Sequence, residues 1–334
     1  MGLSELTRNA VHVLPEGGLE RKLALGRPLR VKMGIDVTAP DVTLGNGIPL
    51  QRMRAFQDEG HTGVLIVGDY TTRIGDPSGR KTERPMIEPE VIDANAKRYF
   101  EHASTIIDPE RTEVRFNSEW LGKLDFAEIL RLTRTTTVAR MLERDDFAKR
   151  FAASEPISVS ELLYPLMQAY DSVAVEADVE LGGTDQLYNL LMGRDVMEAY
   201  GLEPQVALTV EYLDSWDGTG MSASRGNYIG LKEAPEEQFG KAMRIPDSLL
   251  SQWYRLIMER DDVPEIEHAE PVVHLPALLA ETFGQSTSHW RRVIDQGGVR
   301  ADGRVLDSYD VDTASIAGEV IQAGKRQFLR IRAA

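Results

Sequence analysis

The chain has 334 residues, 42% of them hydrophobic, and no cysteine. This length favours one large α/β domain with a smaller second domain, and the absence of cysteine excludes disulfides, thiolate metal sites and a cysteine nucleophile. A formal net charge of −15 argues against a protein covered with phosphate-binding surface. The N-terminus has no signal-peptide core and the apolar runs are only of strand length, so we expect a cytoplasmic protein without a membrane span.

The charge differs along the chain. Residues 286–334 carry eight Lys or Arg and six Asp or Glu, a net charge of +2, and the remainder has a net charge of −17. A C-terminal module that faces RNA would have this bias. An excess of two charges is small, however, and charge alone favours an ordinary surface over an RNA-binding one.

Hydrophobic periodicity predicts strands that alternate with helices through the first 260 residues. A helical lead-in over 6–25 precedes a strand over 29–35 and a helix over 48–57, and residues 61–70 have the continuous apolar pattern of a strand buried on both faces. The other expected elements are helix 89–102, strand 112–116, helices between 126 and 175 with a cap at Ser158, strand 177–181, helix 187–199, strand 205–211 and helices between 235 and 259. This alternation predicts a parallel sheet with right-handed crossovers.

The end of the chain is compositionally different. Residues 260–276 are acidic and contain proline, which indicates a linker. Two short helices and two short strands follow, centred on Leu278, Trp290, Val299 and residues 328–331. The expected organisation is a Rossmann-like α/β domain with helical insertions, a linker and a small α+β domain, at residues 1–262, 263–274 and 275–334.

Three polar loops follow strands of the predicted sheet at their carboxyl ends, where doubly wound sheets bind ligands. They carry Asp36 and Thr38; Asp76, Arg80 and Arg84; and the run from Gly182 to Gln186. The strand–turn–helix stretch 31–46 also offers the N–H groups of a helix N-terminus to phosphate. These patterns are typical of a nucleotide site.

Tyr164, Gln168 and Asp171 are spaced i, i+4 and i+7, so they share one helical face. A phenol, an amide and a carboxylate on one face could bind a small polar ligand. A packed tyrosine with two solvated polar neighbours is the alternative, and these three residues alone favour it.

Several stretches resemble the tyrosyl-tRNA synthetases, which are class I aminoacyl-tRNA synthetases. The resemblance covers residues 30 to about 262 through VKMGIDVTAPDVTLGN, GDYTTRIGDPSGRKTERP, TVARMLERDDF, YPLMQAYDS and ELGGTDQ. Residues 275–334 resemble the small RNA-binding module that ends bacterial members. The resemblance implies a homodimeric enzyme that binds tyrosine and ATP, the latter together with Mg²⁺, and no protein metal site.

The resemblance also implies roles in amino-acid binding. Tyr164, Gln168 and Asp76 would hold the ammonium group, Asp171 would accept a hydrogen bond from the phenol, and Gln186 would lie near the substrate. A buried carboxylate facing a hydroxyl is left unpaired by phenylalanine, and that mismatch can discriminate by about 10⁵.

Further roles concern the nucleotide. Asp36, with Thr38 after it, would lie beside the reacting carboxylate and the α-phosphate. Arg80 and Arg84 would grip the leaving pyrophosphate with forked, permanently charged donors. Contacts to the nucleotide would come from Gly34, Gly45, Gly182, Gly183, Asp185 and Met221.

Both signature motifs of the family are altered. His-Ile/Leu-Gly-His is replaced by TLGN at residues 43–46, and Lys-Met-Ser-Lys-Ser by GMSAS at residues 220–224. The remaining catalytic candidates in these motifs are Thr43, Asn46, Ser222 and Ser224. Asn46 can offer an amide N–H where an imidazole N–H is expected, and Thr43 keeps a hydroxyl donor. The two missing lysines have no nearby replacement except Arg225, and Val37 stands where the family usually has proline.

The region before the C-terminal module is also short. Family members carry a helical anticodon-reading domain there, whereas about 15 residues are available here. Three functions therefore stay open: ATP-dependent activation of tyrosine or a relative, with tRNA or a small molecule of a biosynthetic pathway as acceptor; transfer from an already charged tRNA; and a non-catalytic regulator that binds tyrosine or RNA. The retained residues Asp36, Asp76, Arg80 and Arg84 favour the first.

Overall fold

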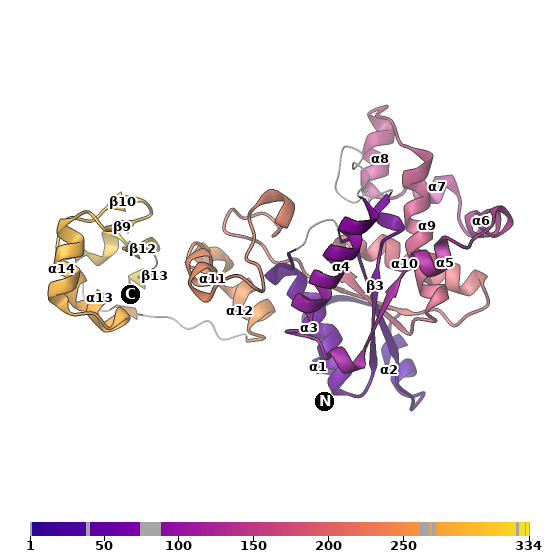
Figure 1. Cartoon of the computed structure of the whole chain (residues 1–334), viewed down its shortest axis with the longest axis horizontal. Coiled ribbons are helices and arrows are strands. Elements are labelled where there is room, and N and C mark those ends of the chain that lie inside the picture. The colour runs from indigo at the N-terminus through magenta and orange to yellow at the C-terminus, as the bar shows by residue number, and fades with distance from the viewer. Residues whose placement is uncertain are drawn as a thin grey trace. The chain divides into compact units, whose positions relative to one another are not determined.

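A six-stranded sheet organises residues 1–212, the first of the two units into which the chain divides (Figure 1). The computed structural model describes residues 2–37, 41–73, 88–260, 267–268, 272–324, 327–330 and 332–333. The strands lie in the order β1 (Ala10–Leu14), β6 (Val206–Val210), β5 (Val179–Gly183), β2 (Arg30–Ile35), β3 (Thr62–Val67) and β4 (Thr112–Phe116). All neighbours are parallel except β1, which runs antiparallel to β6.

The strand order reverses at β2. The chain continues from β2 to β3 and β4 on one side, and later to β5 and β6 on the other. In register, Ile35 of β2 lies opposite Val67, and Met33 lies opposite Leu181 of β5. A reversal of this kind opens a crevice at the carboxyl ends of the central strands, where ligands bind in doubly wound sheets. The predicted Rossmann-like α/β class is confirmed.

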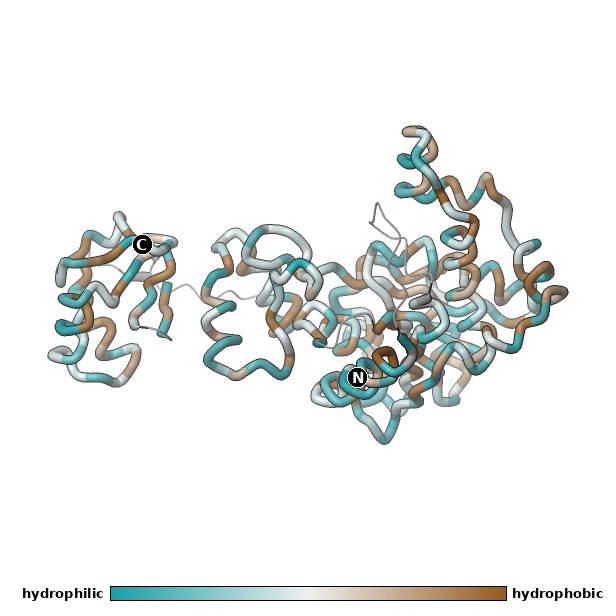
Figure 2. The backbone as a smooth tube through the Cα atoms, turned by 45° about the horizontal axis from the view of Figure 1, so that its top comes forward, coloured by the Kyte–Doolittle hydropathy of each residue, from teal (hydrophilic) through white to brown (hydrophobic). Residues whose placement is uncertain are grey.

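Helices connect and cover the strands. Those of the first unit are α1 (Leu3–Leu6), α2 (Gly18–Leu23), α3 (Leu44–Asp58), α4 (Pro89–Ala103), α5 (Ser118–Leu121), α6 (Phe126–Thr133), α7 (Val138–Met141), α8 (Asp145–Ala152), α9 (Val159–Ala174) and α10 (Leu187–Ala199). Helix α3 packs on β3 and β5, and α10 packs on β5, β6 and α9. Hydrophobic and hydrophilic residues alternate along the tube in Figure 2, as expected for helices with one buried face.

The start of α9 follows the sequence signal. Ser158 is its N-cap and forms a capping box with Glu161, whose carboxylate also pairs with Arg150 at 2.5 Å. This reciprocal bonding satisfies N–H groups that a helix N-terminus leaves unpaired. It therefore fixes where α9 begins and which face carries its polar residues.

The predicted lead-in helix over residues 6–25 is wrong in its middle part. Strand β1 separates α1 from α2 and pairs with the edge of the sheet at β6. The run AVHVL contains β-branched residues in alternation, and pairing with β6 satisfies its backbone groups in a way that a short isolated helix could not. This strand also makes the sheet mixed rather than wholly parallel.

Residues 213–334 form the second unit. Its helices are α11 (Pro235–Ala242), α12 (Leu250–Ile257), α13 (Leu275–Phe283) and α14 (Thr287–Asp295). A four-stranded antiparallel sheet has the order β10 (Arg304–Val305), β9 (Val299–Ala301), β12 (Val320–Ala323) and β13 (Gln327–Arg330). The unit also contains two separate two-stranded sheets. They pair β8 (Val272–His274) with β11 (Asp310–Asp312), and β7 (Glu267–His268) with β14 (Arg332–Ala333). The four helices and the strands β9 and β13 were predicted, whereas β7, β8, β10, β11, β12 and β14 were not.

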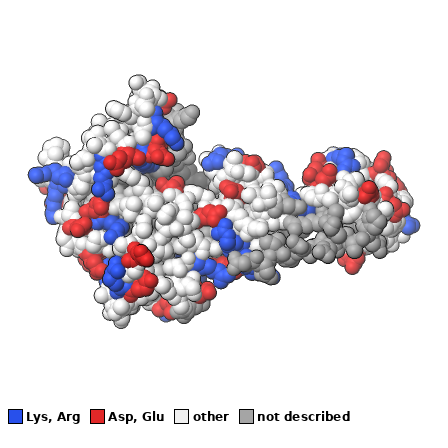
Figure 3. Space-filling model, turned by 180° about the vertical axis from the view of Figure 1, so that it is seen from behind, with Lys and Arg blue, Asp and Glu red and all other residues white. Residues whose placement is uncertain are grey.

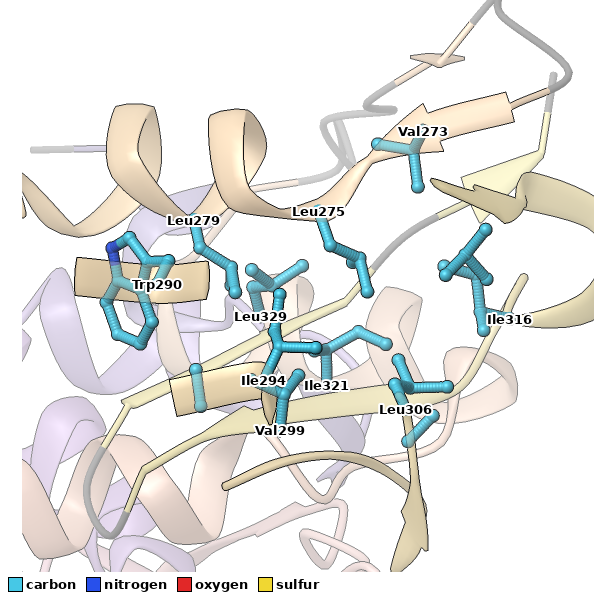
Figure 4. Packing of buried hydrophobic residues seen from close by; sticks show 13 residues of the cluster. Val273, Leu275, Leu279, Trp290, Ile294, Val299, Leu306, Ile316, Ile321 and Leu329 are labelled. Atoms are coloured by element: carbon cyan, nitrogen blue, oxygen red, sulfur yellow. The ribbon is translucent and has the colours of Figure 1, made fainter. Parts of the chain in front are cut away.

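The end of this unit has a hydrophobic core of its own. Trp290 and Ile294 of α14 pack with Leu275 and Leu279 of α13 against Ile321 of β12 (Figure 4). Strands β7 and β8 both lie inside the predicted linker 263–274, and Val273 of β8 joins this core. Most of that linker lies outside the described residues, and the boundary at residue 262 stays a prediction.

The charges of this unit are mixed. Arg291 and Arg292 are exposed, as predicted, but Arg291 stacks on Tyr309 at 5.6 Å, and Arg304 pairs with Glu319 at 2.9 Å. Figure 3 shows acidic and basic side chains interspersed on the visible face. No helix within the described part of the chain combines the length and hydrophobicity that a membrane crossing requires.

Candidate active site

The carboxylate of Asp36 lies directly after β2 and receives hydrogen bonds from two other segments. Its Oδ1 accepts from Thr71 Oγ1 at 3.0 Å and Thr72 Oγ1 at 3.5 Å, and its Oδ2 accepts from the Tyr164 hydroxyl at 2.9 Å. The two threonines follow β3, and Tyr164 lies on α9. The structure thus brings together two residues that were predicted to share a site, Asp36 and Tyr164.

Gly68, between β3 and these threonines, makes room for this arrangement. A Cβ atom at residue 68 would lie 2.4 Å from both Asp36 Oδ1 and Thr71 Oγ1. Any side chain there would displace one of the two partners. Gly68 and Thr71 were not predicted as site residues, although a glycine at the carboxyl end of a buried strand was a usable signal.

Asp171, one helical turn beyond Gln168 on α9, has a buried carboxylate. It is 4% exposed, accepts a hydrogen bond from Trp120 Nε1 at 2.8 Å and another from Asn117 Nδ2 at 3.4 Å. The interpretation of Tyr164, Gln168 and Asp171 as a packed tyrosine with solvated neighbours is therefore wrong for Asp171. The shared helical face is confirmed, and Asn117 and Trp120 are partners that the sequence did not reveal.

Asn117 connects the two carboxylates. Its Nδ2 also donates to Thr71 Oγ1 at 3.1 Å, and that hydroxyl in turn donates to Asp36. Its Oδ1 accepts from the N–H of Tyr70 at 2.9 Å, which fixes the amide. A continuous chain of hydrogen bonds therefore runs from Asp36 through Thr71 and Asn117 to Asp171, across β2, β3, β4 and α9.

Burial raises the pKa of Asp171 to about 7. The charge of Lys32 and the hydrogen bonds from Trp120 and Asn117 favour the ionised form and oppose this increase, whereas the charge of Glu180 adds to it. At neutral pH the carboxylate is therefore poised between its two protonation states. Its hydrogen-bonding character can change with pH in the range where most enzymes work.

The predicted Gly182 and Gly183 end β5, and Asp185 and Gln186 lie in the turn that follows it. A Cβ at Gly183 would lie 2.7 Å from the Tyr212 ring, so packing alone requires glycine there. Gln186 donates to Asp185 at 3.1 Å and accepts from Asn189 Nδ2 at 2.9 Å. These contacts order the loop, and its contact with a nucleotide stays a prediction.

Gly34 borders open space on β2. A Cβ added to it would meet no atom within 4 Å, so this position leaves room beside the carboxyl end of the strand. The predicted site residues Thr38, Asp76, Arg80 and Arg84 lie outside the described residues.

Thr43 and Asn46, at the altered first motif, form a capping box at the start of α3. Thr43 Oγ1 accepts from the N–H of Asn46 at 3.2 Å, and Asn46 Oδ1 accepts from the N–H of Thr43 at 3.0 Å. The Thr43 hydroxyl also donates to Asn46 Oδ1 at 2.9 Å. The hydroxyl that was expected to donate to a ligand is thus engaged with Asn46, and Asn46 Nδ2 has no acceptor among the described residues. Gly45 lies between the two in the first turn.

The altered second motif lies in the second unit, on a loop closed by Asn227. The Asn227 side chain accepts from the N–H of Ser222 at 2.9 Å and donates to both carboxylate oxygens of Asp217. The N–H of Met221 bonds the carbonyl of Leu213 at 2.8 Å, and the hydroxyls of Ser222 and Ser224 lie 3.0 Å apart. The loop therefore satisfies most of its polar groups internally.

Ionisation of Asp171 should destabilise the folded protein. Its pKa is about 7 in the folded state, and an aspartate in an unfolded chain titrates near pH ~4. Between these values the folded state binds more protons, so the free energy of unfolding falls as pH rises through this window and levels off above it. We expect wild type to lose up to about 1.4 kcal/mol per pH unit relative to Asp171→Asn, measured by urea unfolding from about pH 5 to pH 8. A stability difference that does not vary with pH would contradict the assignment.

Comparison with known proteins identifies the family. Residues 24–274 match the family described as tRNA synthetases class I (W and Y). The tyrosine–tRNA ligase of Moorella thermoacetica is 44% identical over 390 positions, which cover 98% of this chain and 94% of the relative. That of Thermotoga maritima is 41% identical over 384 positions, covering 98% and 96%. An alignment of 390 positions exceeds the 334 residues here, so at least 56 positions of the Moorella protein have no counterpart in this chain.

Solved structures are similar in fold. Tyrosyl-tRNA synthetase from Archaeoglobus fulgidus, determined with L-tyrosine, has a TM-score of 0.62 at 22% identity and covers 96% of this chain and 86% of its own. The truncated mitochondrial enzyme of Aspergillus nidulans has a TM-score of 0.62 at 21% identity, covering 75% and 77%. With a family match over most of its length and relatives above 40% identity, the chain belongs to the tyrosyl-tRNA synthetase family of class I aminoacyl-tRNA synthetases, which are ATP-dependent ligases.

Proposed function

We propose that the protein binds tyrosine and activates its carboxylate with ATP. The observation that carries this proposal is the hydrogen-bonded chain between Asp36 and Asp171. Asp171 would accept a hydrogen bond from the phenol, and Tyr164 and Gln168, with Asp76, would hold the ammonium group. Asp36 would lie at the opposite end, beside the carboxylate that reacts.

The proposed reaction is a displacement at the α-phosphorus of ATP. An oxygen of the tyrosine carboxylate forms the new bond to phosphorus, and the bond to the leaving pyrophosphate breaks. The protein contributes position and stabilisation of the developing charge. Mg²⁺ would accompany ATP on its phosphates, because the described residues contain no group of three or more His, Asp or Glu side chains suited to hold a metal.

The altered motifs suggest a slow reaction. Removal of one donor to a transition state of this kind typically reduces the rate by about 10²–10³. Thr43 and Asn46 are partly engaged in the cap of α3, and GMSAS supplies no cation. These features give weight to the alternative that the protein binds tyrosine without activating it, either as a regulator or as an enzyme that uses charged tRNA.

The proposal for the acceptor of the activated tyrosine rests on a segment that the Moorella relative has and this chain lacks. At least 56 positions of the Moorella relative have no counterpart in this chain. We place them between α12 and α13, where family members carry a helical anticodon-reading domain and this chain has only about 15 residues. Without that domain, a tRNA would be held by its acceptor end and the C-terminal module alone. A tRNA recognised in this reduced way, or a small-molecule acceptor of a biosynthetic pathway, fits the proposal, and a cytoplasmic location is part of it.

Activation predicts tyrosine-dependent exchange of labelled pyrophosphate into ATP. The exchange should need tyrosine and ATP but no tRNA, because the acceptor enters after the adenylate forms. Calorimetric titration with tyrosine on the same preparation supplies the control. Binding of tyrosine without exchange for any aromatic amino acid would reject activation and support the non-activating alternative.

Restoring the lost cations should accelerate that exchange. A Cβ at Gly220 meets no atom within 4 Å, so a lysine fits there, and Ala223 begins a short turn that is not buried. We expect Gly220→Lys/Ala223→Lys to raise the exchange rate by about 10²-fold or more and to lower the KM for ATP. Gly220→Gln/Ala223→Gln is the uncharged control. Equal rates in the two variants would show that missing charge does not limit activation.

The proposed homodimer is supported by exposed hydrophobic side chains. Five large ones lie between residues 126 and 159 with exposed fractions of 50–74%: Phe126, Leu130, Val138, Phe151 and Val159. Burial of side chains of this size in an interface would be favourable. Phe126→Asp/Phe151→Asp should shift the protein to monomer in sedimentation equilibrium, whereas Met258→Asp, an exposed hydrophobic of the second unit, should not. A wild-type protein that stays monomeric at micromolar concentration would reject the dimer.

A further inference from the structure

A buried ion pair lies beneath α9. Lys32 on β2 and Glu180 on β5 are 0% and 1% exposed, and Lys32 Nζ lies 2.9 Å from Glu180 Oε1. A buried pair of this kind rarely adds net stability, because removing two charges from water costs about as much as their attraction returns. The position of the ion pair under the site therefore indicates a role other than stabilising the fold.

The pair binds the segment of α9 that carries the proposed ligand contacts. Lys32 Nζ donates to the carbonyl of Gln168 at 3.1 Å and to Ser172 Oγ at 2.7 Å. Ser172 Oγ donates onward to Glu180 Oε2 at 3.3 Å. Lys32 thus holds the helical turn from Gln168 to Ser172, which includes Asp171, and its charge also favours the ionised form of Asp171.

Glu180 determines how the Gln168 amide is oriented. Gln168 Nε2 donates to Glu180 Oε1 at 3.3 Å, and Gln168 Oε1 has no hydrogen-bond donor within the part of the chain that the structure describes. A carboxylate accepts only, so it selects the NH₂ end of the amide and leaves the carbonyl oxygen for another group. An ammonium group is a pure donor and matches that oxygen.

We propose that Glu180 is a positioning residue for amino-acid binding: it fixes the Gln168 amide with Oε1 available to an ammonium group, and Lys32 balances its buried charge. The inference rests on the proposed binding of tyrosine and assigns a specific task to a side chain that touches no ligand. Gln205, which also donates to Glu180, completes the set of groups that hold its carboxylate.

The test compares ligands that differ only at the ammonium end. Tyrosine and 3-(4-hydroxyphenyl)propionate share the phenol and carboxylate, but the second lacks the ammonium group. In Glu180→Gln, the new amide no longer selects one orientation of Gln168, so the Kd for tyrosine should rise by about tenfold while that for the propionate changes less than about twofold. Calorimetric titration measures both constants.

Two further variants separate positioning from a general disturbance. Asp178→Asn is the matched control, because Asp178 is likewise a buried carboxylate next to β5 and is 2% exposed. Among the described residues its carboxylate bonds Lys22, Arg27 and the N–H of Arg30, and no residue of α9. It should leave both constants unchanged. In a double-mutant cycle, Glu180→Gln should have no further effect once Gln168→Ala has removed the amide.

The outcomes are distinct. Equal weakening of both ligands by Glu180→Gln, additive effects in the cycle, or the same change in Asp178→Asn would overturn the positioning role. Should Glu180→Gln unfold, Lys32→Met/Glu180→Gln removes both charges together; any effect through Asp171 is then common to both ligands, and tyrosine should still lose about tenfold more affinity than the propionate. A wild-type protein that binds neither ligand would reject the proposed tyrosine binding itself, which distinguishes failure of that proposal from failure of this one.

Discussion

The structure of the site depends on satisfying two carboxylates at the carboxyl edge of the sheet. A buried carboxylate without donors is costly, so Asp36 and Asp171 must each be supplied with N–H or O–H groups. Thr71 and Asn117 supply both and connect them. These donors come from segments after β3 and β4. The geometry of the site therefore depends on the register of these strands. Changing either carboxylate therefore affects the fold as well as the chemistry.

The need to supply both carboxylates with donors also explains which features of the site could be predicted from the sequence and which could not. The spacing of Tyr164 and Asp171 on one helix is a local property, so it could be predicted and is confirmed. Donors such as Trp120 and Asn117 lie some 50 residues away and are recognisable only once β4 is placed beside β3. Gly68 could have been noticed from its place at the end of a buried strand, but the contact between Asp36 and Thr71 that requires a glycine there joins two separate segments and is not encoded locally.

The incorrect helix prediction near the N-terminus likewise results from contacts between segments that are distant in the sequence. Residues 10–14 were assigned to a helix because a short apolar run has no decisive period of its own. Their strand conformation comes from pairing with β6, nearly 200 residues later. By contrast, α10 was predicted with its observed bounds over 13 residues, a length that favours a helix over a strand. Length, rather than importance to the site, decided which elements could be predicted.

The two groups of predicted site residues are constrained very differently. Asp36, Tyr164, Gln168 and Asp171 are held by hydrogen bonds that connect β2, β3, β4, β5 and α9, so most substitutions there would leave a partner unsatisfied. The altered motifs instead satisfy themselves locally: Thr43 and Asn46 bond each other, and the GMSAS loop is closed by Asn227. Replacing the family's histidines and lysines in such places does not break a buried hydrogen-bond network. Divergence in these two motifs, with retention of the residues bonded to Asp36 and Asp171, is thus what the fold permits most easily.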